Sequence, residues 1–550
     1  MTLKLTDTKE VIRDNSACGS LAILYDKIWN KRQSDLVFVP HDVTRDEPKE
    51  SRAGVVVRER VTQLTWLVEE DCPLILKAYF KLKGVLIRDE YRFILAAIWN
   101  IISEGDGRLS GYLPQPDLWK TDADSPPHNP FVGLTIKWSG EDEVPGVIVT
   151  GTPGIGKSAF LLVVLALRLL AGLTTVYHET WFLVDSNKGI IEPPQSFIDA
   201  CNSSSRKLII AASPRKNRFD FTSKDMCYRT VWMNPFSFAE YIEARGLQGS
   251  NTLPCELDLE TFFQLYGPSA RAAFSMVTKP DNYKNILQSN IDWISSTGIE
   301  KTLRNINQGY FENQFSQLVF VAKRLHDKPY DFYVEFASRF ITELVLDAFM
   351  RQDTENGYKI YRQLLKMDYA RACAGNLLEA LCLNRLPLGG QWRMRRMKIN
   401  KKHSLDQVDE HWVVDKSSPL FTLLIGQEGF AVEIAPGERC MDSNAFSGVD
   451  RHEYGRSTDP SANEQAGFYI PVGDNQSSFD AWIYESSTKH TVVLQCIIEM
   501  TTLFIQSKGV KWSKEHTVDV IIVSDEEGGM DITTPYTESG LIRNVYRLVY

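Results

Sequence analysis

Between residues 141 and 300, continuous apolar runs alternate with a leucine-rich stretch of helical spacing. The apolar runs are typical of strands buried on both faces of a parallel sheet, and they fall at 146–150, 181–185 and 208–213. The leucine-rich stretch at 159–170 is long enough to cross between two such strands. Strands that alternate with helices predict a doubly wound parallel α/β sheet over 141–300.

The pattern changes on both sides of this segment. Residues 1–140 form a mixed N-terminal region without a chemical motif, in which 62–102 has roughly helical spacing. Residues 301–368 predict a helical connector. Residues 369–550 predict a second α/β domain, in which a helix precedes strands at 479–484, 491–498 and 518–523.

A glycine-rich loop joins the first apolar run to the leucine-rich helix. It reads Gly151-Thr152-Pro153-Gly154-Ile155-Gly156-Lys157-Ser158, which has the spacing of a phosphate-binding P-loop. Glycines let backbone N–H groups approach phosphate oxygens, and the following helix N-terminus favours negative charge. In this pattern Lys157 reaches the β- and γ-phosphates, and Ser158 coordinates Mg²⁺. The loop therefore predicts a site for a nucleoside triphosphate, ATP, with Mg²⁺.

Two further polar segments follow the next apolar runs. Asp185 ends the run 181–185, where a Walker B carboxylate holds Mg²⁺ directly or through water; the alternative is an aspartate that caps a turn. Because Ser186 comes next, the sequence identifies no base to activate water. The segment 213–218 supplies either a cation that senses phosphate or a solvated basic loop.

Carboxylates in the C-terminal region suggest a second metal site. Glu379 falls on a predicted helix, Asp480 at the head of a predicted strand, and Glu499 on the next apolar segment beside the neutral Gln495. Carboxylate oxygens suit Mg²⁺, and the metal can activate water against a phosphodiester. This arrangement is typical of metal-dependent nucleases, with Gln495 and Glu499 both open as the second-strand residue. The alternative is that these carboxylates are structural.

The overall charge and the local charge of the chain point in opposite directions for nucleic-acid binding. The net charge of −9 argues against a protein that binds nucleic acid by overall charge alone. The run 391–402 nevertheless holds six cations and no acid. It either follows a phosphate backbone or forms a solvated strand face.

The remaining composition is that of a soluble protein of several domains. The 550 residues are 43% hydrophobic and 24% charged. The nine cysteines include no Cys-x-x-Cys pair, so neither a zinc ribbon nor a disulfide framework is expected. No signal peptide is visible, and the most apolar stretch, 159–173, is too short to span a membrane and contains Arg168.

Taken together, the order of these motifs resembles the Crinkler effectors of oomycetes and fungi and the related retrotransposon hot spot proteins of trypanosomes. The segments that carry the resemblance in the first α/β region are 149–158, 182–185, 212–215 and 233–237. Those in the C-terminal region are 374–375, 378–379, 388–390, 469–471, 475, 479–481 and 518–523. The family often has Gln-x-Thr on the second catalytic strand; here Gln495 lacks that threonine, and Glu499 is followed by Thr501, so this strand has no lysine of a Glu-x-Lys motif.

The resemblance implies a P-loop NTPase joined to a restriction-endonuclease-like domain. It implies an effector that binds and hydrolyses ATP and cuts DNA with Mg²⁺, through Glu379, Asp480 and Gln495 or Glu499. It also implies secretion and targeting to the host nucleus, with host nuclear proteins as partners. The alternative is a nucleotide switch or scaffold that modulates host transcription or signalling and carries a degenerate nuclease domain. The oligomeric state stays open.

Overall fold

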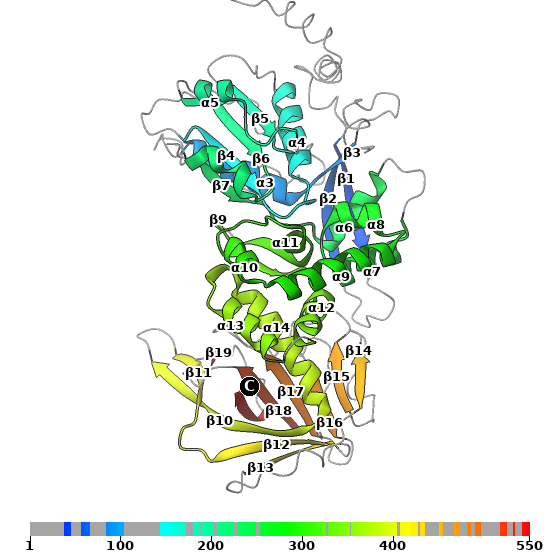
Figure 1. Cartoon of the computed structure of the whole chain (residues 1–550), viewed down its shortest axis with the longest axis vertical. Helices are drawn as coiled ribbons and strands as arrows, with labels where there is room; N and C mark the ends of the chain where they lie inside the picture. Colours follow the sequence, from blue (N-terminus) through cyan, green and yellow to red (C-terminus); the bar gives the residue numbers. More distant parts are fainter. Residues whose placement is uncertain are drawn as a thin grey trace, which may run out of the picture. The chain divides into compact units, whose positions relative to one another are not determined.

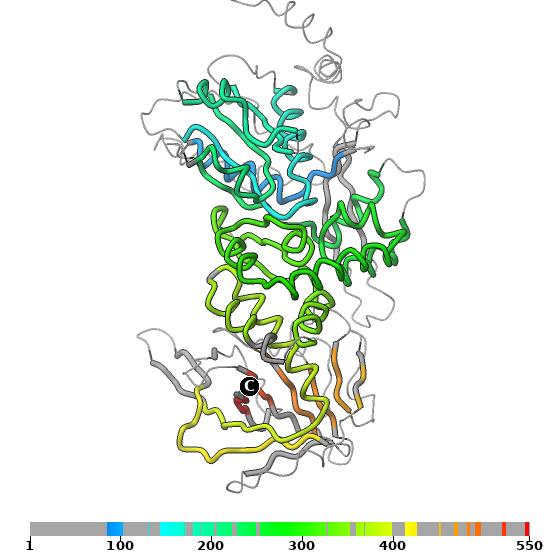
Figure 2. Tube along the Cα trace, viewed as in Figure 1, coloured from blue at the N-terminus to red at the C-terminus, as the bar shows by residue number. Residues whose placement is uncertain are grey.

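The chain divides between Ala337 and Ser338 in the computed structural model. The first unit comprises Met1–Arg45 and Val57–Ala337, and the second comprises Asp46–Val56 and Ser338–Tyr550. Figure 2 follows the trace of both units in sequence colours. The structure describes residues 38–45, 57–65, 84–103, 131, 144–171, 180–187, 189–202, 206–223, 228–248, 254–325, 328–351, 354–403, 408–426, 429–434, 450–454, 467–471, 481–485, 490–496, 517–524, 532–533 and 542–549.

A parallel sheet of four strands forms the centre of the first unit (Figure 1). Its strand order is β5-β6-β4-β7, and every neighbouring pair is parallel. The prediction of a parallel sheet is confirmed. The strands are β4 (Gly146–Thr150), β5 (Trp181–Asp185), β6 (Lys207–Ala211) and β7 (Arg229–Trp232).

Helices cover both faces of this sheet because alternate strand residues point to opposite sides. Val147 and Val149 share one core cluster with α3 (Asp89–Ser103) and α4 (Lys157–Leu170). Ile148 belongs to a second cluster, with residues of α5 (Gln195–Asn202). All five residues of β4 are buried, so the apolar run predicted as a strand lies in the middle of the sheet.

The N-terminal region differs from the expectation of helical spacing over 62–102. A three-stranded antiparallel sheet contains β1 (Phe38–Arg45), β2 (Val57–Thr65) and β3 (Gly84–Ile87), and among the described residues of this region only α3 is helical. Residues 84–103 precede the expected boundary at residue 140, but Val85, Ile87 and the apolar face of α3 join the core of β4. Core contacts between residues 84–103 and β4, which are distant in the sequence, place these residues with the parallel sheet.

The rest of the first unit is a run of helices that ends in a hairpin. The hairpin strands pair antiparallel, so the expected helical connector over 301–368 is interrupted by strands and crosses the division at Ala337. These elements are α6 (Phe238–Gly246), α7 (Glu256–Tyr266), α8 (Ala270–Met276), α9 (Pro280–Thr297), α10 (Glu300–Asn307), α11 (Gln314–Val319), β8 (Phe320–Leu325) and β9 (Lys328–Phe336).

The second unit begins with three helices: α12 (Arg339–Met350), α13 (Thr354–Leu365) and α14 (Arg371–Arg385). A mixed sheet of eleven strands follows. Its strands are β10 (Gly390–His403), β11 (Val408–Val414), β12 (Leu420–Gly426), β13 (Gly429–Ile434), β14 (Arg451–Tyr454), β15 (Gly467–Pro471), β16 (Ala481–Glu485), β17 (His490–Cys496), β18 (Thr517–Ser524), β19 (Ile532–Thr533) and β20 (Ile542–Val549).

The three predicted C-terminal strands correspond to β16, β17 and β18. β16 and β17 are antiparallel, whereas β17, β18 and β20 run parallel to one another. One row across the sheet consists of Tyr469, Trp482, Val493, Val520 and Val545, each paired with the next and each buried.

Among the described residues, no helix is both long and apolar enough to cross a membrane.

Candidate phosphate-binding site

The glycine-rich loop connects the buried end of β4 to the first turn of α4. Gly151, Gly154 and Gly156 have φ values of 141°, 89° and 89°, which residues with a Cβ adopt rarely. Between them, Thr152 and Ile155 are buried, and Pro153 is half-buried. The loop therefore folds back over the carboxyl edge of the sheet, where open α/β sheets bind ligands.

Lys157 is the first residue of α4 and is buried. Its Nζ donates hydrogen bonds to the carbonyl oxygens of Gly151 at 2.8 Å and Thr152 at 2.9 Å. Burial, and after it the charge of Arg271, lower the pKa of the Lys157 ammonium to about 7, whereas Asp185 acts in the opposite direction. The lysine thus lies inside its own loop, with little compensating negative charge.

Ser158 and Asp185 meet at the same edge of the sheet. The Ser158 Oγ donates a hydrogen bond of 2.9 Å to the Asp185 Oδ1. β6 lies between β4 and β5, so the loop and Asp185 come from strands that are not neighbours. A hydroxyl and a carboxylate at this distance can both coordinate one Mg²⁺.

The basic segment 213–218 turns around the end of β6. Arg218 Nη1 donates a hydrogen bond of 2.7 Å to the Ser186 carbonyl, directly after Asp185. Burial lowers the pKa of the Arg218 guanidinium, the Arg215 charge lowers it further, and Asp185 raises it. Ser186 Oγ donates to the Ile191 carbonyl at 2.7 Å, so this hydroxyl is engaged in its own turn. The segment therefore places cationic charge beside Asp185.

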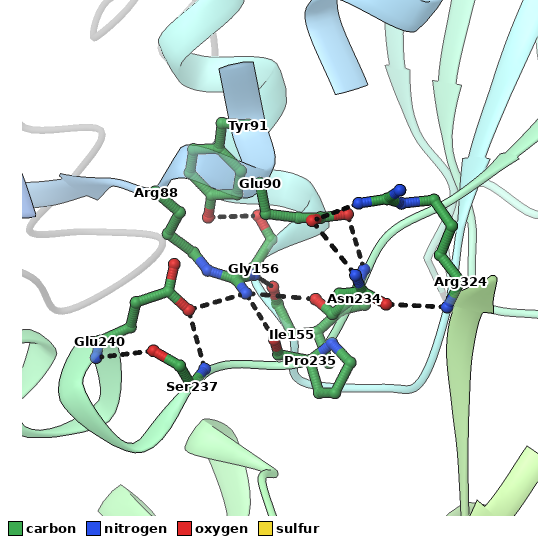
Figure 3. Close-up of polar contacts among 10 residues, drawn as sticks. All are labelled: Arg88, Glu90, Tyr91, Ile155, Gly156, Asn234, Pro235, Ser237, Glu240 and Arg324. Carbon is green, nitrogen blue, oxygen red and sulfur yellow. Dashed lines mark hydrogen bonds and ion pairs between the residues drawn. The ribbon is translucent and has the colours of Figure 1, made fainter. Parts of the chain in front are cut away.

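A buried arginine supports the loop from the side of α3 (Figure 3). Arg88 is 1% exposed and lies between β3 and α3. Its guanidinium donates to the carbonyl oxygens of Ile155 at 2.9 Å, Asn234 at 3.2 Å and Pro235 at 2.6 Å. It also forms an ion pair of 3.0 Å with Glu240. The Arg88 guanidinium thus forms hydrogen bonds to both the glycine-rich loop and the segment that follows β7.

Glu240 is itself fixed by a helix cap. It accepts a hydrogen bond of 2.8 Å from the Ser237 N–H, and Ser237 Oγ accepts from the Glu240 N–H at 3.2 Å. This capping box begins α6 directly after Pro235 and Phe236. The segment Asn-Pro-Phe-Ser at 234–237 begins α6, and Arg88 joins this segment to the glycine-rich loop.

A second set of contacts joins α3 to the hairpin (Figure 3). Glu90 accepts from the Asn234 N–H at 2.9 Å and forms an ion pair of 3.1 Å with Arg324. The Arg324 N–H donates to Asn234 Oδ1 at 2.8 Å. Next to Glu90, the Tyr91 hydroxyl donates to the Gly156 carbonyl at 2.9 Å. Arg88, Glu90 and Tyr91 thus contact three separate parts of the first unit: the glycine-rich loop, the segment after β7 and the hairpin.

The hairpin also contacts the loop directly. The Ala322 N–H on β8 donates a hydrogen bond of 3.0 Å to Thr152 Oγ1, in the interior of the protein. Sequence analysis missed this contact and the network around Arg88. The only local signal was the charged series Arg88-Asp89-Glu90 between an apolar strand and an apolar helix.

The residues predicted for a nuclease site are only partly described. Glu379 is half-buried on α14, and α14 packs against β17, the strand that contains Gln495. Asp480 and Glu499 lie outside the described residues. Within the part of the chain that the structure describes, no three His, Cys, Asp or Glu side chains are grouped as metal ligands.

The basic run lies on β10, where four of its cations are exposed: Arg393, Arg395, Arg396 and Lys398. Lys398 pairs with Asp415 at 3.1 Å. Further along, Lys401 and Lys402 are in register with Glu410 and Asp409 of β11.

The partners on the other half of the run carry no acid. Arg393 is in register with Thr422, and Arg395 with Leu420 and Arg547. The positive charge of β10 is therefore concentrated at its first half.

Comparison with protein-family models, with curated proteins and with solved structures finds no match to this chain. The class of protein is therefore argued from the residues and geometry above.

Replacing Arg88 tests the network beneath the loop. Arg88→Met leaves Glu240 buried without its partner and three carbonyl groups without a donor, so we expect a loss of about 3–5 kcal/mol of stability in the first unit. Native-state hydrogen exchange of the β4 amides measures this free energy. Lys328→Met, which removes an exposed ion pair of 3.8 Å, is the control and should change it by less than about 1 kcal/mol. Equal effects of the two substitutions would contradict the assignment.

Proposed function

We propose that the first unit binds a nucleoside triphosphate, ATP, with Mg²⁺ at the loop 151–158 and hydrolyses it. The observation that carries this proposal is the hydrogen bond between Ser158 and Asp185, because it joins two motifs 27 residues apart at one edge of a parallel sheet. A hydroxyl and a carboxylate are the oxygen ligands that Mg²⁺ uses beside a triphosphate.

The charges around the loop support an anionic ligand. The charges of Arg271 and Arg218 both lower the pKa of Lys157, and Asp185 is the carboxylate that raises the pKa of Lys157 and of Arg218. A triphosphate supplies the negative charge that this arrangement favours. The Lys157 ammonium leaves its own loop carbonyls and contacts phosphate oxygens instead, while the loop N–H groups and the start of α4 bind the same oxygens.

For the second unit, we propose a Mg²⁺-dependent DNA nuclease, as the resemblance implies. Two observations support this proposal. The helix of Glu379 packs against the strand of Gln495. Gln495 is also in register with Ile522, Ile522 with Arg547, and Arg547 with Arg395, so one exposed cation of β10, Arg395, belongs to the same backbone row.

A second candidate function is a nucleotide-dependent switch or scaffold that acts on host transcription or signalling. It is favoured by Gln495, a neutral residue where a carboxylate would bind metal, and by Thr501, which stands where a Glu-x-Lys motif starting at Glu499 would have its lysine. In either case the proposal extends to an effector that is secreted and acts in the host nucleus, on the resemblance alone. DNA cleavage by the purified chain distinguishes the two candidates.

Lys157→Ala removes the charge that stabilises the β- and γ-phosphates. We expect ATP turnover to fall by about 10²–10³-fold and ATP affinity to fall with it. Steady-state hydrolysis and calorimetric binding measure both. Lys301→Ala, at an exposed position of α10, should leave both unchanged. Wild-type turnover in the Lys157 variant would show that this loop is not the ATPase site.

The pKa of Lys157 makes binding depend on pH. Because this pKa is about 7 in the free protein, the side chain is mostly neutral at about pH 8, and a bound triphosphate raises its pKa. Binding should therefore take up close to one proton at about pH 8 and almost none from Lys157 at about pH 6, and affinity should fall as pH rises above 7. Calorimetry in buffers of different ionisation enthalpy measures the uptake. Its persistence in Lys157→Ala would exclude this lysine as the source.

Asp185→Asn separates metal binding from folding. The amide keeps an oxygen to accept from Ser158 but loses the charge that holds Mg²⁺. We expect kcat to fall by about 100-fold, while metal-free nucleotide affinity and the melting temperature stay near wild type. Asp331→Asn, on the hairpin, is the control with an exposed carboxylate. A wild-type kcat in Asp185→Asn would remove this residue from the site.

Asp480→Ala tests the nuclease. If the second unit cuts DNA with Mg²⁺, this change should reduce cleavage by about 10²-fold or more, because a metal ligand is lost. Cleavage of labelled duplex DNA is the measurement, and Asp450→Ala, at an exposed position before β14, is the control. A wild-type chain without cleavage, or a variant with full cleavage, would favour the switch or scaffold.

A further inference from the structure

A short helix outside the parallel sheet contacts the middle of the phosphate loop. The chain reaches this helix, α8, through the turn Gly267-Pro268-Ser269. Gly267 has φ of 81°, and a Cβ there would collide with the Ala337 carbonyl oxygen. Ala270 and Ala273 are buried, whereas Arg271 is exposed. The face of α8 that carries Ala270 and Ala273 is therefore buried, whereas Arg271 lies on the solvent-exposed face of the same helix.

The start of α8 lies against Gly154. A Cβ at Gly154 would be 3.0 Å from the Arg271 Cβ and 3.0 Å from the Ser269 Oγ. Such distances are shorter than ordinary van der Waals contact, so only glycine lets the loop and α8 approach this closely. The Arg271 side chain thus begins at the tip of the loop that is proposed to enclose the phosphates.

Arg271 differs from the other cations of the site. Lys157 donates to two loop carbonyls, and Arg218 donates to the Ser186 carbonyl beside Asp185. Within the described residues, the Arg271 guanidinium makes no hydrogen bond or ion pair. Arg271 lies against Gly154, three residues before Lys157, and the positive charges of Arg271 and Lys157 repel one another.

We propose that Arg271 binds the terminal phosphate of the nucleoside triphosphate and so distinguishes it from a diphosphate. The proposal rests on the proposed nucleotide site. Lys157 reaches the β- and γ-phosphates, and an anion between Lys157 and Arg271 turns their repulsion into two charge-assisted contacts. Arginine suits this role because its planar guanidinium binds phosphate through two parallel N–H donors.

The geometry also gives α8 a role in sensing the nucleotide. Arg271 belongs to the helices that follow the sheet, whereas Lys157, Ser158 and Asp185 belong to the sheet edge. A terminal phosphate held by both groups connects the two parts, and its hydrolysis removes that connection. Arg271 therefore acts as a specificity residue for the triphosphate.

The test compares two nucleotides on the full chain: a non-hydrolysable ATP analogue and ADP, each with Mg²⁺. For Arg271→Ala, we expect analogue affinity to fall by about tenfold or more and ADP affinity to change by less than about threefold. Arg271→Lys keeps the charge and should lose less analogue affinity than the alanine variant. Arg304→Ala, another exposed arginine of the first unit, should leave the ratio of the two affinities unchanged.

The ratio of the two affinities is the informative readout, because a merely structural change would weaken both nucleotides together. A ratio in Arg271→Ala equal to that of wild type would overturn the inference. Failure of the wild-type chain to bind the analogue would instead overturn the proposed nucleotide site. The melting temperature of each nucleotide-free variant confirms that the chain is folded.

Discussion

The buried guanidinium of Arg88 is the interaction on which the geometry of the first unit depends. It binds carbonyl groups from the phosphate loop and from the segment after β7, and its charge is balanced by Glu240. Additional hydrogen bonds offset the cost of burying an ion pair, and here the capping box of α6 supplies one to the Glu240 carboxylate from the Ser237 N–H. The shape of the loop and the start of α6 are therefore fixed together.

Beside Arg88, the glycine-rich loop is stabilised by hydrogen bonds to its own backbone. Lys157 satisfies its three donors partly on the carbonyls of Gly151 and Thr152, and Ser158 donates to Asp185. Burial nevertheless disfavours the charged lysine. A ligand that supplied negative charge would replace these contacts with charge-assisted ones, which is the physical basis of the proposed triphosphate site.

The hairpin links the loop to the boundary between the two units along the chain. Ala322 and Arg324, on one strand, donate backbone hydrogen bonds to Thr152 and Asn234. The second strand of the hairpin ends at Phe336, and the second unit begins two residues later. The glycine-rich loop is thus hydrogen-bonded to a hairpin whose second strand leads directly into the second unit.

The sequence alone determined the loop, the strand before it, the helix after it and three strands of the second unit. These features depend on glycine spacing and on apolar periodicity among residues close along the chain. The tertiary structure decided that residues 84–103 belong to the core of β4, that Asp185 meets Ser158, and that Arg324 pairs with Glu90 across 234 positions. Such contacts depend on which buried charges can reach a partner in space, and no local pattern of residues records that.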